Sequence, residues 1–140
     1  MRKDSRLSRV LHVLVHLDVH EQPVTSESIA KMLTTNPVVV RRTMALLREC
    51  GYVAAVKGHK GGWSLSCSLS DITLLDIHRA LGERSVFTIG LTDEHNNCLI
   101  EHAVNRALDG AMKDAEALLL QRFGEVTLAD LSRDFENNYG

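Results

Sequence analysis

The stretch that most constrains the fold is residues 34–65, which read TTNPVVVRRTMALLRECGYVAAVKGHKGGWSL. Asn36 can accept a hydrogen bond from the free amides of a first helical turn, and Pro37 sacrifices no needed donor at the first helical position. Apolar residues then recur every three or four positions, and Gly51 can take the left-handed conformation that closes a helix. This pattern predicts a helix over residues 37–50.

A hairpin follows this helix. Residues 52–56 are an apolar run, residues 57–62 hold three glycines and can only turn, and residues 63–65 return as a second strand. The helix carries Arg41 and Arg42 on its early turns, and the hairpin tip carries Lys57, His59 and Lys60. A helix of this diameter fits the DNA major groove, and a glycine-rich tip can approach phosphates closely. The pattern indicates a winged helix-turn-helix, which we favour over a helix and hairpin that merely pack together.

The residues before this stretch complete the motif. An apolar stripe of Leu7, Val10, Leu11, Leu14 and Leu17 predicts a first helix capped by Asp4 or Ser5. A second, short helix starts after Pro23. Its cap is Thr25 or Ser26, and the amides at its start can meet a phosphate.

Three histidines lie four residues apart on the first predicted helix: His12, His16 and His20. Paired histidines at this spacing can hold a metal ion, because both rings project from adjacent turns. No carboxylate or cysteine completes the set nearby, so we interpret them as a solvated polar face and predict no metal site.

Charge separates the two ends of the chain. The formal net charge is -2, but residues 1–65 hold ten Lys and Arg against five Asp and Glu, whereas residues 66–140 hold six against thirteen. A basic amino-terminal part would orient the protein on a polyanion. No apolar run approaches the roughly 18 residues that span a bilayer, and no signal-peptide core follows Met1, so we expect a cytoplasmic protein without membrane contact.

The carboxyl-terminal half is predicted to dimerise. A helix over about residues 70–82 packs on the winged core, and the longest helical pattern runs from about 99 to 122. Its apolar positions step by four and three, as in a seam between two helices, and they are Val104, Leu108, Ala111, Ala115 and Leu118. The helix could instead lie on its own domain. We favour a homodimer, because a palindromic operator needs a two-fold protein.

Residues 47–65 resemble the wing of the Rrf2 family of bacterial transcription regulators, in which Leu-Arg-x-x-Gly-Leu-Val precedes a basic residue, Gly, two variable residues and Gly-Gly-aromatic-x-Leu. The matching positions are Leu47, Arg48, Gly51, Val53, Lys57, Gly58, Gly61, Gly62, Trp63 and Leu65. ITLLDI at 72–77 and CLIEHAV at 98–104 extend the resemblance over nearly the whole chain. It implies a winged-helix DNA-binding regulator, commonly a repressor.

Cluster-binding members of this family place three cysteines before the long helix. Cys98 matches the third position, but the upstream two fall at Thr92 and Val86, and an acidic ligand known from one relative falls at Ser8. One thiolate cannot hold an iron–sulfur cluster. We therefore disfavour a cluster and expect no cofactor. Cys98 is then either a redox thiol or a plain, partly buried residue, and we favour the second.

These inferences define one hypothesis: a mainly α fold with a small β wing, with residues 1–82 as the DNA-binding domain and residues 83–140 as a hinge loop and dimerisation helices. We expect no enzyme, because no catalytic constellation is present. The alternative is a winged-helix module that acts mainly through protein partners. The sequence names neither the operator nor a small-molecule or redox effector. The predicted DNA contacts are Thr25, Ser26, Asn36, Val38, Val39, Arg41, Arg42, Lys57, Gly58, His59 and Lys60.

Overall fold

A computed structural model of the chain describes residues 4–82, 85–93 and 97–139. The predicted fold class, mainly α with a small β wing, is confirmed. In chain order the elements are α1 (Arg6–Val19), α2 (Ser26–Leu33), α3 (Pro37–Glu49), β1 (Val53–Val56), β2 (Gly62–Leu65), the 3-10 helix η1 (Leu69–Asp71), α4 (Leu74–Ala80), α5 (Leu99–Glu125) and α6 (Leu128–Tyr139).

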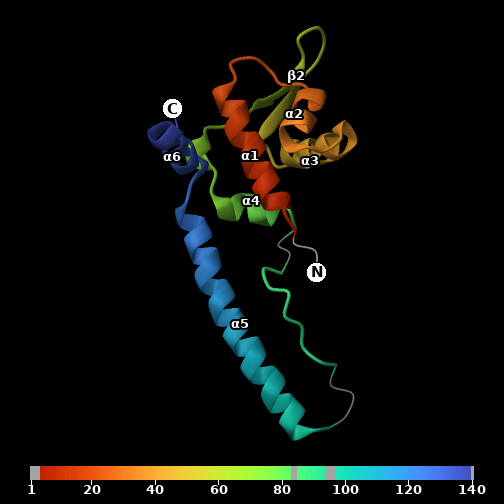
Figure 1. Cartoon of the computed structure of the whole chain (residues 1–140), viewed down its shortest axis with the longest axis vertical. Coiled ribbons are helices and arrows are strands. Elements are labelled where there is room, and N and C mark those ends of the chain that lie inside the picture. The colour runs from red at the N-terminus through yellow and green to blue at the C-terminus, as the bar shows by residue number, and fades with distance from the viewer. Residues whose placement is uncertain (1–3, 83–84, 94–96, 140) are drawn as a thin grey trace.

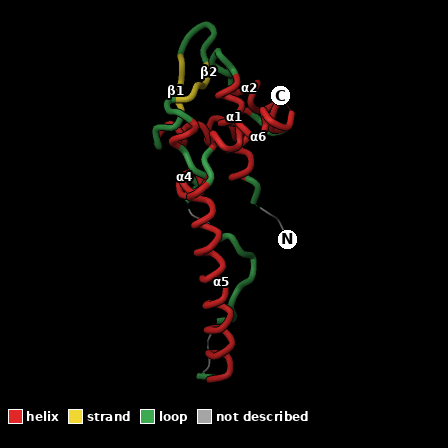
Figure 2. Tube along the Cα trace, turned by 90° about the vertical axis from the view of Figure 1, so that its left-hand side faces the viewer, coloured by secondary structure: helices red, strands yellow, loops and turns green. Residues whose placement is uncertain are grey.

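The molecule consists of a winged body and one long projecting helix. Figure 1 shows α1 to α4, the wing and α6 gathered in the body, while α5 extends away from it on the side opposite the wing tip. The view turned by a quarter shows the same projection (Figure 2). At 1.5 Å per residue, the 27 residues of α5 span about 40 Å. No helix among the described residues is long and apolar enough to cross a membrane.

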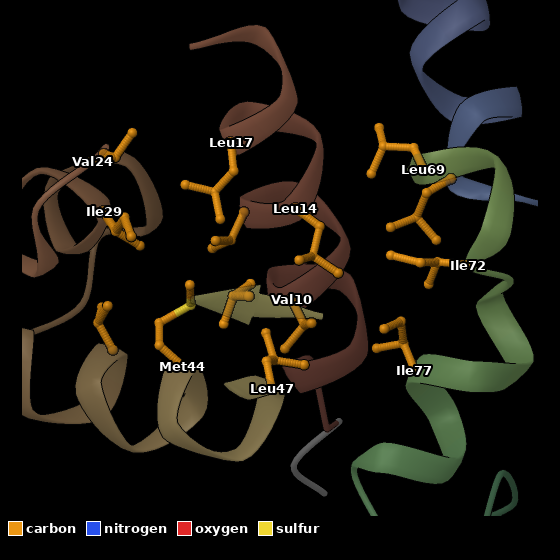
Figure 3. Close-up of a cluster of buried hydrophobic side chains, with 14 of the residues drawn as sticks. Val10, Leu14, Leu17, Val24, Ile29, Met44, Leu47, Leu69, Ile72 and Ile77 are labelled. Atoms are coloured by element: carbon orange, nitrogen blue, oxygen red, sulfur yellow. The ribbon is translucent and has the colours of Figure 1, made fainter. Parts of the chain in front are cut away.

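The hydrophobic core of the body is built around α1. Val10, Leu14 and Leu17 of the predicted stripe are buried, together with Val13, whereas Leu7 and Leu11 lie at the core's edge. Figure 3 shows α1 between two groups of side chains, those of α2 and α3 on one flank and those of η1 and α4 on the other. Burial of both flanks explains why the stripe on α1 is wide.

The carboxyl-terminal helix α6 belongs to this core. Leu128 is completely buried, its amide donates to the Ile72 carbonyl at 2.8 Å, and the Leu74 amide donates to the Val126 carbonyl at 3.0 Å. Thr73 and Thr127 also form a β-bridge. Residues 128–139 therefore complete the core of the winged body. The predicted boundary at residue 82 does not separate two packing units, because a distant segment returns across it.

Candidate nucleic-acid interface

The helix-turn-helix is formed by α2 and α3 and the tight turn between them. Thr34 adopts the left-handed conformation (φ 54°), and the Thr35 amide donates to the Ala30 carbonyl at 2.9 Å. Asn36 caps α3 as predicted, since its side-chain oxygen accepts from the Val39 amide at 3.0 Å. The turn and the cap together fix the direction in which α3 leaves α2.

One face of α3 is buried and the opposite face is exposed to solvent. Val40, Met44 and Leu47 are buried against the body. On the first two turns, Val38 is 53% exposed, and both arginines are exposed. The predicted reading group is thus brought together on one solvent-facing surface at the start of α3, apart from Val39, which is half-buried. The members of this group are Asn36, Val38, Arg41 and Arg42.

Arg41 has an acidic neighbour on α2. Its guanidinium lies 3.6 Å from the Glu27 carboxylate on α2, and more than half of each side chain is exposed. An exposed pair of this kind contributes about 0 to 1 kcal/mol, so Arg41 can exchange it for a base or phosphate at little cost. Sequence alone could have located Glu27 only through its place in the first turn of α2, where acidic residues favour the helix dipole.

The wing is a two-stranded antiparallel hairpin in which Val53 pairs with Leu65 and Val56 with Gly62. Its tip, residues 57–61, is a tight turn: Gly58 has φ 91°, and the Gly61 amide donates to the Gly58 carbonyl at 3.0 Å. A Cβ at Gly61 would lie 2.3 Å from the Val56 oxygen, so only glycine fits there. The cationic side chains of the tip are all exposed, and they are Lys57, His59 and Lys60.

The wing is attached to the helix-turn-helix by the loop before α2. Val24 and Trp63 exchange two backbone hydrogen bonds, of 2.9 and 2.8 Å, which add one bridge to the edge of β2. The indole Nε1 of Trp63 donates to Ser26 Oγ at 3.0 Å. These bonds join the base of the wing to the start of α2.

This attachment changes the role of one predicted DNA contact. Ser26 is 9% exposed and its hydroxyl accepts the Trp63 hydrogen bond, so the side chain lies behind the surface and supports the wing from inside. Thr25 remains exposed and caps α2 by accepting from the Ser28 amide at 3.1 Å. The Ser26 hydroxyl is therefore engaged inside the protein, by a partner that lies 37 positions away in sequence, and a DNA contact of Ser26 would be made by the backbone amides at the start of α2, as predicted from the sequence.

Apolar positions of α5 are left uncovered within the chain. In the predicted seam Val104 is 51% exposed and Leu118 is 68% exposed, and Leu108, Ala111 and Ala115 are also exposed. The only buried residue of α5 is Asn105, among the side chains that the structure describes. Long, regularly spaced apolar side chains in water are unfavourable, and an exposed apolar face of this kind is typical of an interaction surface.

The segment before α5 is fastened to that helix through Thr92. Asn105 Nδ2 donates to both the carbonyl and the hydroxyl oxygen of Thr92 at 3.2 Å, and the Thr92 hydroxyl donates to Glu101 at 3.1 Å. Residues 94–96 of the predicted polar loop lie outside the described residues. At a position where cluster-binding relatives carry cysteine, this chain places a hydroxyl within a hydrogen-bonded network.

The cysteines and histidines that the structure describes do not form a metal site. Cys98 precedes α5 and is exposed, not partly buried as expected, Cys50 is exposed, and burial raises the pKa of the Cys67 thiol. On α1, the Nε2 atoms of His12 and His16 lie 3.0 Å apart. Partial burial lowers the pKa of His16, and the electrostatic effect of the nearby His12 and His20 lowers it further. Among the described residues, no group of three or more His, Cys, Asp or Glu side chains is arranged so that it could hold a metal ion.

A reading helix capped by Asn36 and a cationic wing bound to its supporting helix define a winged-helix DNA-binding protein. Comparison with known proteins identifies the family. The profile of the Rrf2 family, described as "Iron-dependent Transcriptional regulator", matches residues 4–134. The chain belongs to the Rrf2 family and is a DNA-binding transcription regulator.

Individual relatives agree with this assignment. The chain is 28% identical over 128 residues to YwnA of Bacillus subtilis, named as an HTH-type transcriptional regulator, and the match covers 91% of this chain and 95% of YwnA. Among solved structures it is similar to CymR, the global cysteine regulator of B. subtilis, with a TM-score of 0.65, 26% identity and coverage of 95% and 98%. The T. potens IscR structure shares the fold, with a TM-score of 0.75, 21% identity and coverage of 100% and 92%.

Proposed function

We propose that the protein is a homodimeric repressor that binds a two-fold symmetric operator. The observation that carries this proposal is the joint surface of α3 and the wing. Arg41 and Arg42 are exposed on α3, and Lys57 and Lys60 are exposed at the tip. The Val24 and Trp63 backbone pair joins the wing to the start of α2, and α2 leads through a tight turn into α3. An Arg in the major groove can read guanine, while cations on the wing can neutralise phosphates.

The exposed face of α5 supports the dimer. Its seam residues step by four and three over four turns, as in helices that pack against each other. A second copy would cover them with an identical face, which is the usual arrangement of a closed two-fold assembly. Two winged bodies would then meet two half-sites, and binding to both would restrict access of the transcription machinery to the DNA.

We further propose that the protein works without an iron–sulfur cluster and without enzymatic activity, in the cytoplasm. Thr92 and Val86 stand where cluster-binding relatives carry cysteines, which leaves Cys98 as the single thiolate of that set. Cys98 is exposed at the start of α5, so it is accessible to oxidants. The effector is then a small molecule or a redox signal that needs no cluster.

The test begins by selecting bound DNA from a random pool. Arg41→Ala is then compared with wild type on the selected operator and on single-base variants of it. We expect a loss of about 1 to 3 kcal/mol and relaxed specificity at one base pair per half-site. Arg48→Ala, which removes an exposed arginine from the last turn of the same helix, is the matched control. Failure to enrich any DNA would favour the alternative function, a module that acts through protein partners.

A further inference from the structure

A cavity of about 330 Å³ lies between α1, α2, α3 and the end of α4. Its volume is at the lower end of the range of about 300 to 1,000 Å³ that is typical of small-molecule sites. Most of its lining is apolar, with side chains from three helices and from the residue that follows α4: Val13, Ile29, Leu33, Met44 and Leu81. Three arginines, Arg6, Arg9 and Arg42, complete it.

Positive charge at this cavity is incompletely neutralised. Arg6 pairs with Asp4 at 3.2 Å, on the protein surface. Arg9 is half-buried, and its Nε is fully buried without a hydrogen-bond partner among the described residues. A buried donor that lacks an acceptor costs free energy, and an acceptor atom of a bound molecule would remove that cost. None of the described lining residues is acidic, so the cavity itself supplies no carboxylate.

We propose that this cavity binds a small organic monocarboxylate with an apolar body, which acts as the effector of the regulator. A guanidinium binds a carboxylate through two parallel N–H donors, and Arg9 and Arg42 are the cations available for it. The apolar lining favours a ligand with hydrocarbon to bury and gives no advantage to a fully hydrated inorganic anion. The effector role rests on the proposed function, but binding to the cavity does not.

The cavity is physically linked to the DNA-reading surface. Arg42 and Val39 line it, and both belong to the first two turns of α3. A carboxylate held by Arg42 removes a positive charge from the face that meets DNA. The bound ligand therefore weakens operator binding, and by reciprocity the operator weakens ligand binding by the same factor.

Binding is tested on the full-length protein by titration with benzoate, phenylacetate and isovalerate, each to tens of millimolar, while methyl NMR signals are recorded. We expect at least one acid to shift the Val13, Ile29 and Met44 methyl signals saturably. The corresponding neutral amide should bind at least tenfold more weakly. If none of the three acids binds, or if the amide or inorganic phosphate binds as well as the acid, the proposal is wrong.

Arg9→Gln on α1 should weaken binding of the acid at least tenfold, whereas Arg48→Gln, the same change in the last turn of α3 and outside the cavity, should leave it unchanged. If Arg9→Gln fails to fold in a thermal melt, the acid and amide comparison in wild type decides the question alone. A saturating acid should lower operator affinity at least tenfold in wild type but not in Arg9→Gln, and unchanged affinity would refute the effector role. Acid binding without DNA binding would refute the proposed function and leave the cavity assignment standing. Operator binding without acid binding would refute the cavity assignment and leave the proposed function standing.

Discussion

The contribution of the wing to DNA binding can be measured as a change in salt dependence. Lys57 and Lys60 are exposed at the tip, within a turn whose geometry is fixed by Gly58 and Gly61. We expect each lysine to neutralise about one phosphate, which gives about four contacts in a dimer. The double variant Lys57→Gln/Lys60→Gln removes these charges. Gln is preferred to Ala because it keeps the side chain long.

The expected magnitude follows from counterion release. Each phosphate contact on duplex DNA contributes about 0.9 to the slope of log K against log salt, so the variant's slope should be shallower by about 3 to 4. Between about 50 and 200 mM salt, wild type should therefore lose affinity about a hundredfold more than the variant. Discrimination between operator and mutated operators should change much less, because phosphate contacts carry no sequence information.

Fluorescence anisotropy with a labelled operator at several salt concentrations gives both slopes. The matched control is Arg122→Gln/Arg133→Gln, which makes the same change in net charge by removing exposed arginines of α5 and α6. This control should keep the wild-type slope. Equal slopes for wild type and the wing variant would show that the tip does not touch phosphates. An equally shallow slope in the control would show that only net charge matters.

Four further predictions concern assembly, cofactor, wing attachment and pH. Ala111→Glu should produce monomers in sedimentation, whereas Ala117→Glu, the same change on the other side of α5, should not; an unchanged dimer mass for Ala111→Glu would refute the seam. Protein purified without oxygen should show no iron–sulfur absorption band, and stoichiometric iron and sulfide would contradict the cluster-free proposal. Gly62→Ala should lower the free energy of unfolding, measured by urea titration, by more than about 1 kcal/mol. The reason is that Gly62 has φ 149° and an added Cβ would lie 2.6 Å from the Val24 carbonyl. Gly90→Ala is the control and should have little effect, because the space around Gly90 is open. The pKa of His16 is lowered below its ordinary value of 6.5, so its contribution to stability is present above pH 6.5 and is lost as the pH falls. His16→Gln should therefore reduce the loss of unfolding free energy at acid pH. An unchanged pH profile would show that other groups cause that loss.

Local signals in the sequence were sufficient for the elements that bear on DNA. The Asn36 cap, Pro37 and Gly51 predicted α3 to within one residue, because caps and left-handed closures depend on neighbours only a few positions away. The wing followed from its glycines for the same reason. Exposure of Arg41 and Arg42 on α3 also follows from periodicity, since the buried residues occupy the opposite face. Exposure of the lysines at the wing tip follows from their place in a turn.

Features that depend on distant partners were not predictable in this way. Ser26 looks like a helix cap in sequence, and only the packing of Trp63 shows that its side chain supports the wing. The return of Leu128 into the core depends on the path that α5 takes. Likewise, Arg9 looks in sequence like a residue of an ordinary amphipathic helix, and only the packing of α3 and of the end of α4 shows that it lines a cavity. Each case joins segments tens of residues apart, and such contacts leave no periodic trace.

Because Leu128 of the last helix is part of the core, the winged body cannot be completed until the end of the chain has been synthesised. Synthesis proceeds from the amino terminus, so the reading helix, the wing and α5 all leave the ribosome before α6 can close the body. Until then, Leu69, Ile72 and the rest of that flank lack their cover. We expect chains that terminate early, within α5, to expose this apolar surface and to be degraded. A nonsense mutation late in the gene should therefore behave as a null allele, and its product should not occupy the operator in competition with the intact protein.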